Sequence, residues 1–259
     1  MVNWSEVQKV IFPIKSYEDV CQRLHISFAY PFVQKAYNFS LPVLDTYTQQ
    51  LLKGDPRGRY TIFASQLIDI IHGLHESGVP DVVDLQKRTA SREHLEVLIG
   101  QVKVPAPKIA MLLKYLVYWV VPAEKYLNGL VRDAPGIHEA IAVLRELGVR
   151  TNLQLLEKGI SQVERKVLSN KTHLPVDTIV ELVNRADFSR MPWSSKATIS
   201  NIIGAGYPSL AKLAEAEPGK LYSDFFAYGK SIGKNLKLGN EIESSYRIAK
   251  IMPKVLQDE

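Results

Sequence analysis

Two stretches of the sequence, residues 74–122 and 144–192, have the same length and align without a gap. Identical residues recur at a constant offset along them: Leu74 and Leu144, Gly78 and Gly148, Val79 and Val149, Leu85 and Leu155, Ser91 and Ser161, Leu98 and Leu168, Pro105 and Pro175, Ile109 and Ile179, Leu112 and Leu182, and Pro122 and Pro192. A third, more diverged copy follows, with Gly206, Leu213 and Pro253 at corresponding places. Repetition at this period indicates stacked supersecondary units that share a hydrophobic core.

Each copy has the start and stop signals of several short helices. Gly78, Gly148 and Gly206 each follow a helical pattern, and the residue after a helix often needs a left-handed backbone that glycine adopts most cheaply. Ser161 opens a capping box, "SQVE". Pro175 predicts the start of a longer helix, because the backbone N–H that proline lacks would have no partner in the first turn. Because few stretches alternate with a period of two, the sequence predicts an all-α fold.

The repeat predicts how the chain is divided. We expect three tandem helix-hairpin-helix-like units, over residues 66–133, 134–192 and 193–259. Residues 1–65 do not join the repeat, and their capping and proline signals predict three or four further helices that cap the array or form a small docking domain.

Composition excludes several classes of protein. The 259 residues are 46% hydrophobic and 23% charged, which is typical of a globular chain. The single cysteine, Cys21, permits no disulfide within the chain and, with no secretory signal visible, favours a cytoplasmic location. The most apolar run, residues 109–121, is too short to cross a bilayer and contains Lys114, so we expect a buried core helix and no membrane association.

One stretch carries a resemblance to a known family. Residues 181–221 contain the pattern formed by Ala186, Asp187, Phe188, Arg190, Met191, Gly206, Tyr207, Ser209, Leu210 and Leu213. This pattern resembles the bacterial domain of unknown function numbered 4332, over roughly residues 137–253. The resemblance implies a fold similar to helix-hairpin-helix proteins, and it brings no established activity with it.

In a helix-hairpin-helix, a tight glycine turn exposes backbone N–H groups at a helix N-terminus, where a phosphate can bind. Here the hairpin reads "MPWSSKA", so Trp193, Ser194 and Ser195 replace the glycine-rich turn, with Lys196 beside them. No acidic residue occurs within residues 188–214 or 225–240, although the net charge of +5 is mild. The candidate nucleic-acid-binding residues are therefore Arg190, Ser194, Ser195, Lys196, Lys212, Lys230, Lys234 and Lys237.

The apolar helix of the first unit suggests a different surface. Tyr115, Tyr118 and Trp119 follow helical spacing there, and a helix that is apolar nearly all round is either deeply buried or covered by a partner. These three residues are the candidate protein interface, for a partner protein or for self-association.

Catalytic and metal-binding patterns are weak. Asp69, His72 and Glu76 share a helical face without a second ligand cluster, and Cys21 and His25 lie one turn apart without an evident orienting partner. We expect no catalytic residue, no metal and no cofactor. The sequence therefore favours a non-catalytic helical scaffold that acts through protein–protein association, and the alternative is a protein that binds the nucleic-acid backbone.

Overall fold

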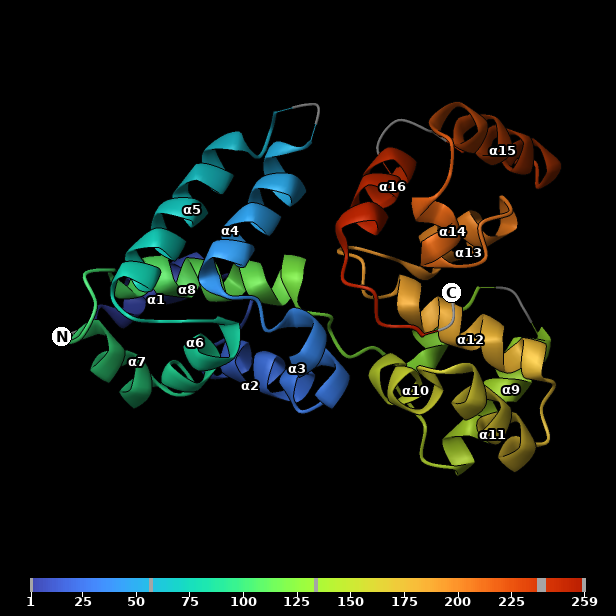
Figure 1. The fold of residues 1–259 in the computed structure, drawn as a ribbon, viewed down its shortest axis with the longest axis horizontal. Helices are drawn as coiled ribbons and strands as arrows, with labels where there is room; N and C mark the ends of the chain where they lie inside the picture. Colours follow the sequence, from blue (N-terminus) through green and yellow to red (C-terminus); the bar gives the residue numbers. More distant parts are fainter. Residues whose placement is uncertain (1, 56–57, 133–134, 237–240, 258–259) are drawn as a thin grey trace. The chain divides into compact units, whose positions relative to one another are not determined.

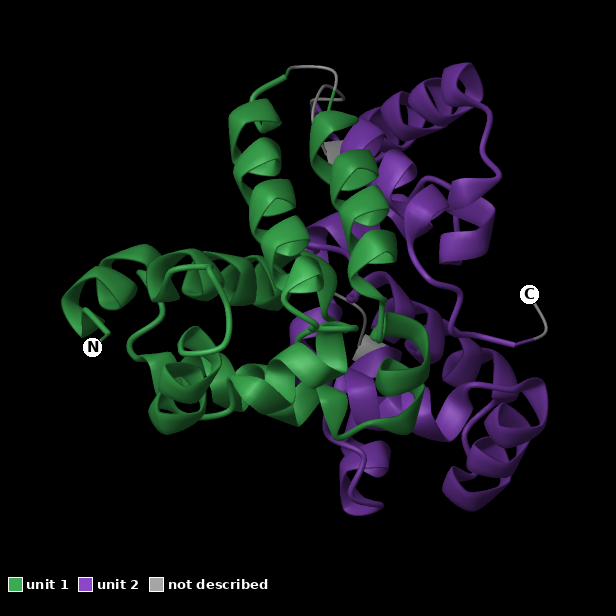
Figure 2. Ribbon diagram, turned by 60° about the vertical axis from the view of Figure 1, so that its left-hand side comes forward, with its two compact units in different colours: residues 1–123 green, residues 124–259 purple. Residues whose placement is uncertain are grey.

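The computed structural model describes residues 2–55, 58–132, 135–236 and 241–257, and these are arranged in sixteen α-helices with no β-strand among them (Figure 1). This confirms the predicted all-α fold. The chain divides into two compact units, unit 1 over residues 1–123 and unit 2 over residues 124–259 (Figure 2). None of the described helices is long and apolar enough to span a bilayer.

Unit 1 holds the N-terminal helices and the first copy of the repeat. Its helical elements are α1 (Trp4–Ile11), α2 (Tyr17–Phe28), α3 (Pro31–Tyr37), α4 (Leu41–Thr48), the π-helical η1 (Gln49–Lys53), α5 (Thr61–Glu76), α6 (Val82–Arg88), α7 (Arg92–Ile99), α8 (Ala106–Tyr115) and the π-helical η2 (Leu116–Val120). The N-terminal region thus contains four α-helices before α5. It packs into the same core as the first repeat, since α1 lies against α8 and α2 against α6.

Unit 2 holds the second and third copies. Its elements are the 3-10 helix η3 (Leu127–Leu130), α9 (Pro135–Glu146), α10 (Asn152–Gly159), α11 (Gln162–Thr172), α12 (Val176–Phe188), α13 (Lys196–Gly204), α14 (Leu210–Ala214), α15 (Pro218–Ser231) and α16 (Glu241–Ile251). Each copy of the repeat therefore corresponds to four successive α-helices: α5–α8, α9–α12 and α13–α16.

The repeated glycines have the same local structure in all three copies. Gly78, Gly148 and Gly206 have φ of 81°, 77° and 98°, and each ends the first helix of its copy. The backbone N–H of the next residue donates to a carbonyl of the last helical turn at 3.1, 2.9 and 3.2 Å in the three copies. This hydrogen bond closes the helix end in the manner of a Schellman motif, so glycine is needed there for its left-handed backbone.

The second helix of each copy begins in the same way. Asp81, Thr151 and Ser209 cap α6, α10 and α14, and each side chain accepts the backbone N–H three residues further on. The first two of these capping residues each form an isolated β-bridge with an earlier residue, Asp81 with Ser40 and Thr151 with Tyr126.

The fourth helix of the first two copies forms the centre of its unit. Ile109, Leu112 and Leu113 of α8 are fully buried against α1, α5 and α7. Ile179, Leu182 and Val183 of α12 are fully buried against α10 and α11. Burying each such side chain contributes about 1.5–3 kcal/mol, so these six residues make a substantial contribution to the stability of the two units.

The helix boundaries refine the predicted limits of the repeat units. The limit predicted between residues 65 and 66 falls inside α5, which begins at Thr61. The next limit, between residues 133 and 134, lies outside the described residues. The limit between residues 192 and 193 falls in the short connection from α12 to α13, where the candidate site is found.

Candidate nucleic-acid interface

Residues 189–195 form the hairpin that connects α12 to α13. Trp193 has φ of 58°, a left-handed backbone that costs a side-chain-bearing residue roughly 1–2 kcal/mol. Trp193 is also one of the residues that replace the glycine-rich turn of a helix-hairpin-helix. The chain therefore retains a glycine-like backbone at this point although the glycine is absent.

A half-buried lysine supports the inner side of the hairpin. Lys125 Nζ donates to the carbonyl oxygens of Ser189 at 2.9 Å and Ser194 at 3.2 Å, and to Ser194 Oγ at 3.2 Å. Asn152 ties the same region together, because its Nδ2 donates to Ser189 Oγ at 2.8 Å and its Oδ1 accepts the Lys125 backbone N–H at 2.7 Å. Burial lowers the pKa of Lys125 to about 8. The hairpin is therefore held by specific contacts inside unit 2.

The outer side of the hairpin ends at the N-terminus of α13. Ser195 Oγ accepts the Thr198 backbone N–H at 3.1 Å, which caps the third N–H of the helix. The first two backbone N–H groups, at Lys196 and Ala197, have no hydrogen-bond partner among the described residues. Lys196 is exposed, and within the same part of the chain its ammonium has no ion-pair partner. This end of α13 can accept an anion, with the positive end of the helix dipole and one lysine beside it.

The structure places Arg190 inside unit 2. Its Nη2 lies 2.6 Å from Asp187 Oδ1, and the two side chains are 2% and 5% exposed. Its Nη1 also donates to the Pro253 carbonyl oxygen at 3.0 Å. Burial raises the pKa of Asp187 against the opposing effect of the adjacent guanidinium. Two residues of the family pattern thus form a buried ion pair, and Arg190 presents no charge to a ligand at the surface.

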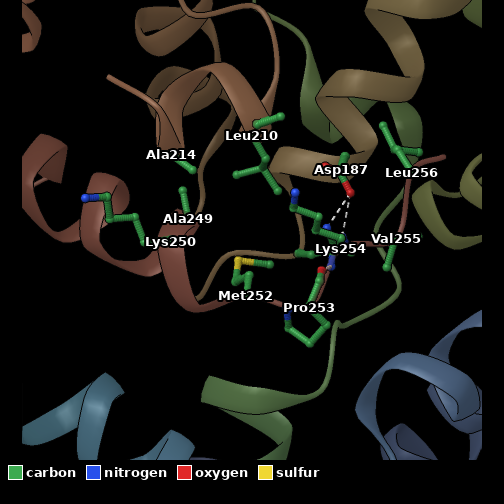
Figure 3. A pocket seen from close by; sticks show the side chains of 12 residues that line it. Asp187, Leu210, Ala214, Ala249, Lys250, Met252, Pro253, Lys254, Val255 and Leu256 are labelled. Atoms are coloured by element: carbon green, nitrogen blue, oxygen red, sulfur yellow. Dashed lines mark hydrogen bonds and ion pairs between the residues drawn. The ribbon is translucent and has the colours of Figure 1, made fainter. Parts of the chain in front are cut away.

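This ion pair lies beside a small cavity of about 100 Å³. Figure 3 shows Asp187 on one side and Met252, Pro253 and Val255 of the C-terminal segment on another. Arg165 also binds this segment, since its Nη2 donates to the Gln257 carbonyl oxygen at 3.0 Å. The two buried arginines fasten the C-terminal segment to α11 and to the hairpin that follows α12.

The remaining serine and lysine candidates have different surroundings. Ser194 Oγ is occupied within the hairpin, where it also donates to the Met191 carbonyl oxygen at 2.9 Å. Lys212 is exposed and pairs with Glu215 at 3.2 Å, which reduces the charge it offers to a ligand. Lys237 lies outside the described residues.

Two further candidates lie on or just after α15. Lys230 Nζ is 4.5 Å from the centre of the Phe226 ring, a cation–π contact one helical turn apart. Lys234 is exposed and follows Gly233, just after the end of α15. Neither lysine has an ion-pair partner in the segments that the structure describes. Lys196, Lys230 and Lys234 are therefore the candidate cations that remain exposed and unneutralised.

The aromatic residues of the first repeat are packed within unit 1. Tyr115 is 1% exposed, and its hydroxyl donates to Thr48 Oγ1 at 3.1 Å. Trp119 is half-buried, with its ring 5.0 Å from that of Tyr60 in an edge-on contact. Tyr118 is half-buried as well. Tyr115 and, in part, Trp119 are therefore packed within unit 1, and the interface assigned to these three residues stays a prediction.

The groups considered for catalysis are also engaged. His72 Nε2 lies 2.9 Å from Asp45 Oδ2. The Cys21 thiol donates to the Thr89 carbonyl oxygen at 3.1 Å, and burial raises its pKa to about 11, which disfavours the thiolate that a nucleophile needs. The described residues contain no group of three or more metal-ligating side chains.

Two residues of this surface were not predicted from the sequence. Lys125 lies in the connection "VPAEKY" that precedes η3, and no spacing connects it to a hairpin more than sixty residues further on. Phe226 carried a usable signal, because it precedes Lys230 by one helical turn within a segment free of acidic residues.

Comparison with known families gives one match. Residues 135–238 match the family model of a domain of unknown function, DUF4332. The matched region lies in unit 2 and includes the hairpin, which agrees with the resemblance stated from the sequence. Comparisons with curated proteins and with solved structures gave no match.

Proposed function

We propose that the chain is a non-catalytic helical-repeat binding protein, and that the hairpin of unit 2 binds the phosphate backbone of a nucleic acid. The observation that carries this proposal is the start of α13, where two backbone N–H groups without partners among the described residues adjoin the exposed Lys196. A phosphate at this position would accept two N–H hydrogen bonds and gain from both the helix dipole and the ammonium. Such contacts read no sequence, so binding would be independent of base order.

The interior of the hairpin supports the same proposal. Lys125 and Asn152 fix the hairpin from inside, so the N–H groups are held in place before any ligand arrives. A binding site that is already ordered loses less conformational entropy on association. Lys230 and Lys234 would add charge further along the same unit.

The test is a titration of a fluorescein-labelled oligonucleotide by fluorescence anisotropy at several salt concentrations. We expect affinity to fall as salt rises, and Lys196→Gln to reduce the slope of log K against log salt by about 1, because one phosphate contact is lost. Lys35→Gln is the matched control, since Lys35 is an exposed lysine of unit 1. Absence of binding at low salt would overturn the proposal, and an unchanged slope in Lys196→Gln would remove the hairpin from it.

Protein association is the second candidate, and a groove on unit 2 favours it. A cavity of about 520 Å³ is lined by Leu147, Val167 and neighbouring residues of α10 and α11. Leu147 and Val167 are 48% and 45% exposed, and the rim carries both charges, from Glu157 and Lys158 among others. An exposed apolar floor with a charged rim is typical of a protein interface, here with a second copy of the chain.

Light scattering after size-exclusion chromatography tests this second candidate. We expect a concentration-dependent dimer that Val167→Glu dissociates, because a carboxylate in the groove would be desolvated without a partner. Val97→Glu is the control, since Val97 is the corresponding exposed residue of the first repeat, 63% exposed. A monomer at every concentration would exclude self-association through this groove.

A further inference from the structure

Three large aromatic side chains among the described residues of unit 2 are exposed, Tyr126, Trp193 and Phe226, and phosphate binding gives the last two no role. Trp193 is 54% exposed and Phe226 is 46% exposed, whereas Phe188 and Phe225 of the same unit are 0% and 3% exposed. A lysine without an ion-pair partner among the described residues lies near each of these last two exposed rings in the sequence: Lys196 follows Trp193 by three residues, and Lys230, one turn after Phe226, has its Nζ 4.5 Å from the centre of that ring.

From this combination we propose that unit 2 binds single-stranded nucleic acid in preference to a duplex. The inference rests on the proposed function and specifies its substrate class. Aromatic rings next to cations match a single strand because its bases are unstacked and can lie on a ring while the neighbouring phosphate meets the lysine. In a duplex the base faces are covered by their neighbours, so the same rings would find no partner there.

The charge density of the two ligands makes the distinction testable. A site that used only lysines and backbone N–H groups would favour the duplex, because double-stranded DNA carries more charge per unit length. Single-strand preference therefore requires that base stacking on Trp193 and Phe226 outweighs the greater electrostatic attraction of the duplex. Stacking of a base on an aromatic side chain is strong enough to do so, since replacing one such side chain typically lowers affinity about tenfold.

The two aromatic–lysine pairs belong to one packed structure. The ring of Tyr228, on α15, lies so close to Gly204, on α13, that a methyl group at Gly204 would overlap it. This contact joins α15, which carries Phe226 and Lys230, directly to the helix that begins at Lys196. The two pairs are therefore carried by segments that are packed together within unit 2.

The test compares an oligothymidylate with a mixed-sequence duplex of the same length, using the full chain and anisotropy at low salt. We expect tighter binding of the single strand, and a loss of about tenfold in that affinity in Trp193→Gly and in Phe226→Leu with little change for the duplex. Phe12→Leu is the control, because Phe12 is an exposed aromatic residue of unit 1, 72% exposed.

Trp193→Gly also separates binding from folding. Glycine adopts the left-handed backbone of this position without strain, so the thermal midpoint is expected to stay level or rise while single-strand affinity falls. Equal or tighter binding of the duplex, or variants that keep the single-strand preference, would overturn this inference and leave the proposed function standing. Failure of both ligands to bind would overturn both.

Discussion

Asp187→Ala is expected to lower the free energy of unfolding of unit 2 by about 3–5 kcal/mol, because it leaves the Arg190 guanidinium buried without its carboxylate. The pair is 2.6 Å apart, and both side chains are almost completely removed from solvent. Arg190 also holds the Pro253 carbonyl oxygen, so an unpaired guanidinium that moves toward water would release the C-terminal segment as well.

Urea unfolding measures this effect. Trp193 is the one tryptophan of residues 124–259, so its fluorescence in a Trp4→Phe, Trp119→Phe background reports on unit 2. The control is Glu215→Ala, which removes an exposed pair with Lys212 and is expected to cost less than about 1 kcal/mol. The double variant Asp187→Leu, Arg190→Met should lose less than Asp187→Ala, because no charge stays buried. A loss below about 1 kcal/mol in Asp187→Ala would contradict this account of the ion pair.

Gly159→Ala is expected to destabilise unit 2 by about 1–3 kcal/mol, because α10 and α12 approach too closely for a side chain at this point. An added Cβ would lie 2.7 Å from Val183 Cγ2 and 3.6 Å from Arg165 Cγ. Val183 is fully buried and, as a β-branched residue in a helix, has essentially one rotamer, so it cannot turn away.

The matched control for this substitution is Gly136→Ala. Gly136 lies in the first turn of α9, and a methyl group added there would meet no described atom within 4 Å, so alanine should be neutral or slightly stabilising. Urea midpoints of the two variants, followed as above, distinguish the two sites. Equal urea midpoints would contradict this prediction, because they would show that the contact between α10 and α12 accommodates a methyl group without loss of stability.

Local signals carried most of the fold prediction. The helix ends at Gly78, Gly148 and Gly206 follow from backbone conformation, and the capping box at Ser161 follows from short-range hydrogen bonds, so both could be predicted from a single sequence. The apolar stripes of α8 and α12 likewise follow from helical spacing. The helix-hairpin-helix character of the repeats, with its functional meaning, stays a prediction.

Charges and aromatic rings were harder to place, because their positions depend on tertiary packing. Arg190 and Lys196 lie in the same acid-free segment, yet one is buried against Asp187 and the other is exposed. Sequence separation hid Lys125, which reaches the hairpin only in the folded unit. The contact of Tyr60 with Trp119 is likewise hidden by sequence separation, and the interface assigned to Trp119 stays a prediction.

The proposed function depends above all on phosphate binding by the backbone N–H groups at the start of α13. Amide chemical shifts in ¹⁵N-labelled protein, recorded while a single-stranded oligonucleotide is added, test it most directly. We expect the amides of Lys196 and Ala197 to shift most, and these shifts to reverse when salt is added. Shifts that leave these two amides unchanged and gather elsewhere in the chain would contradict it.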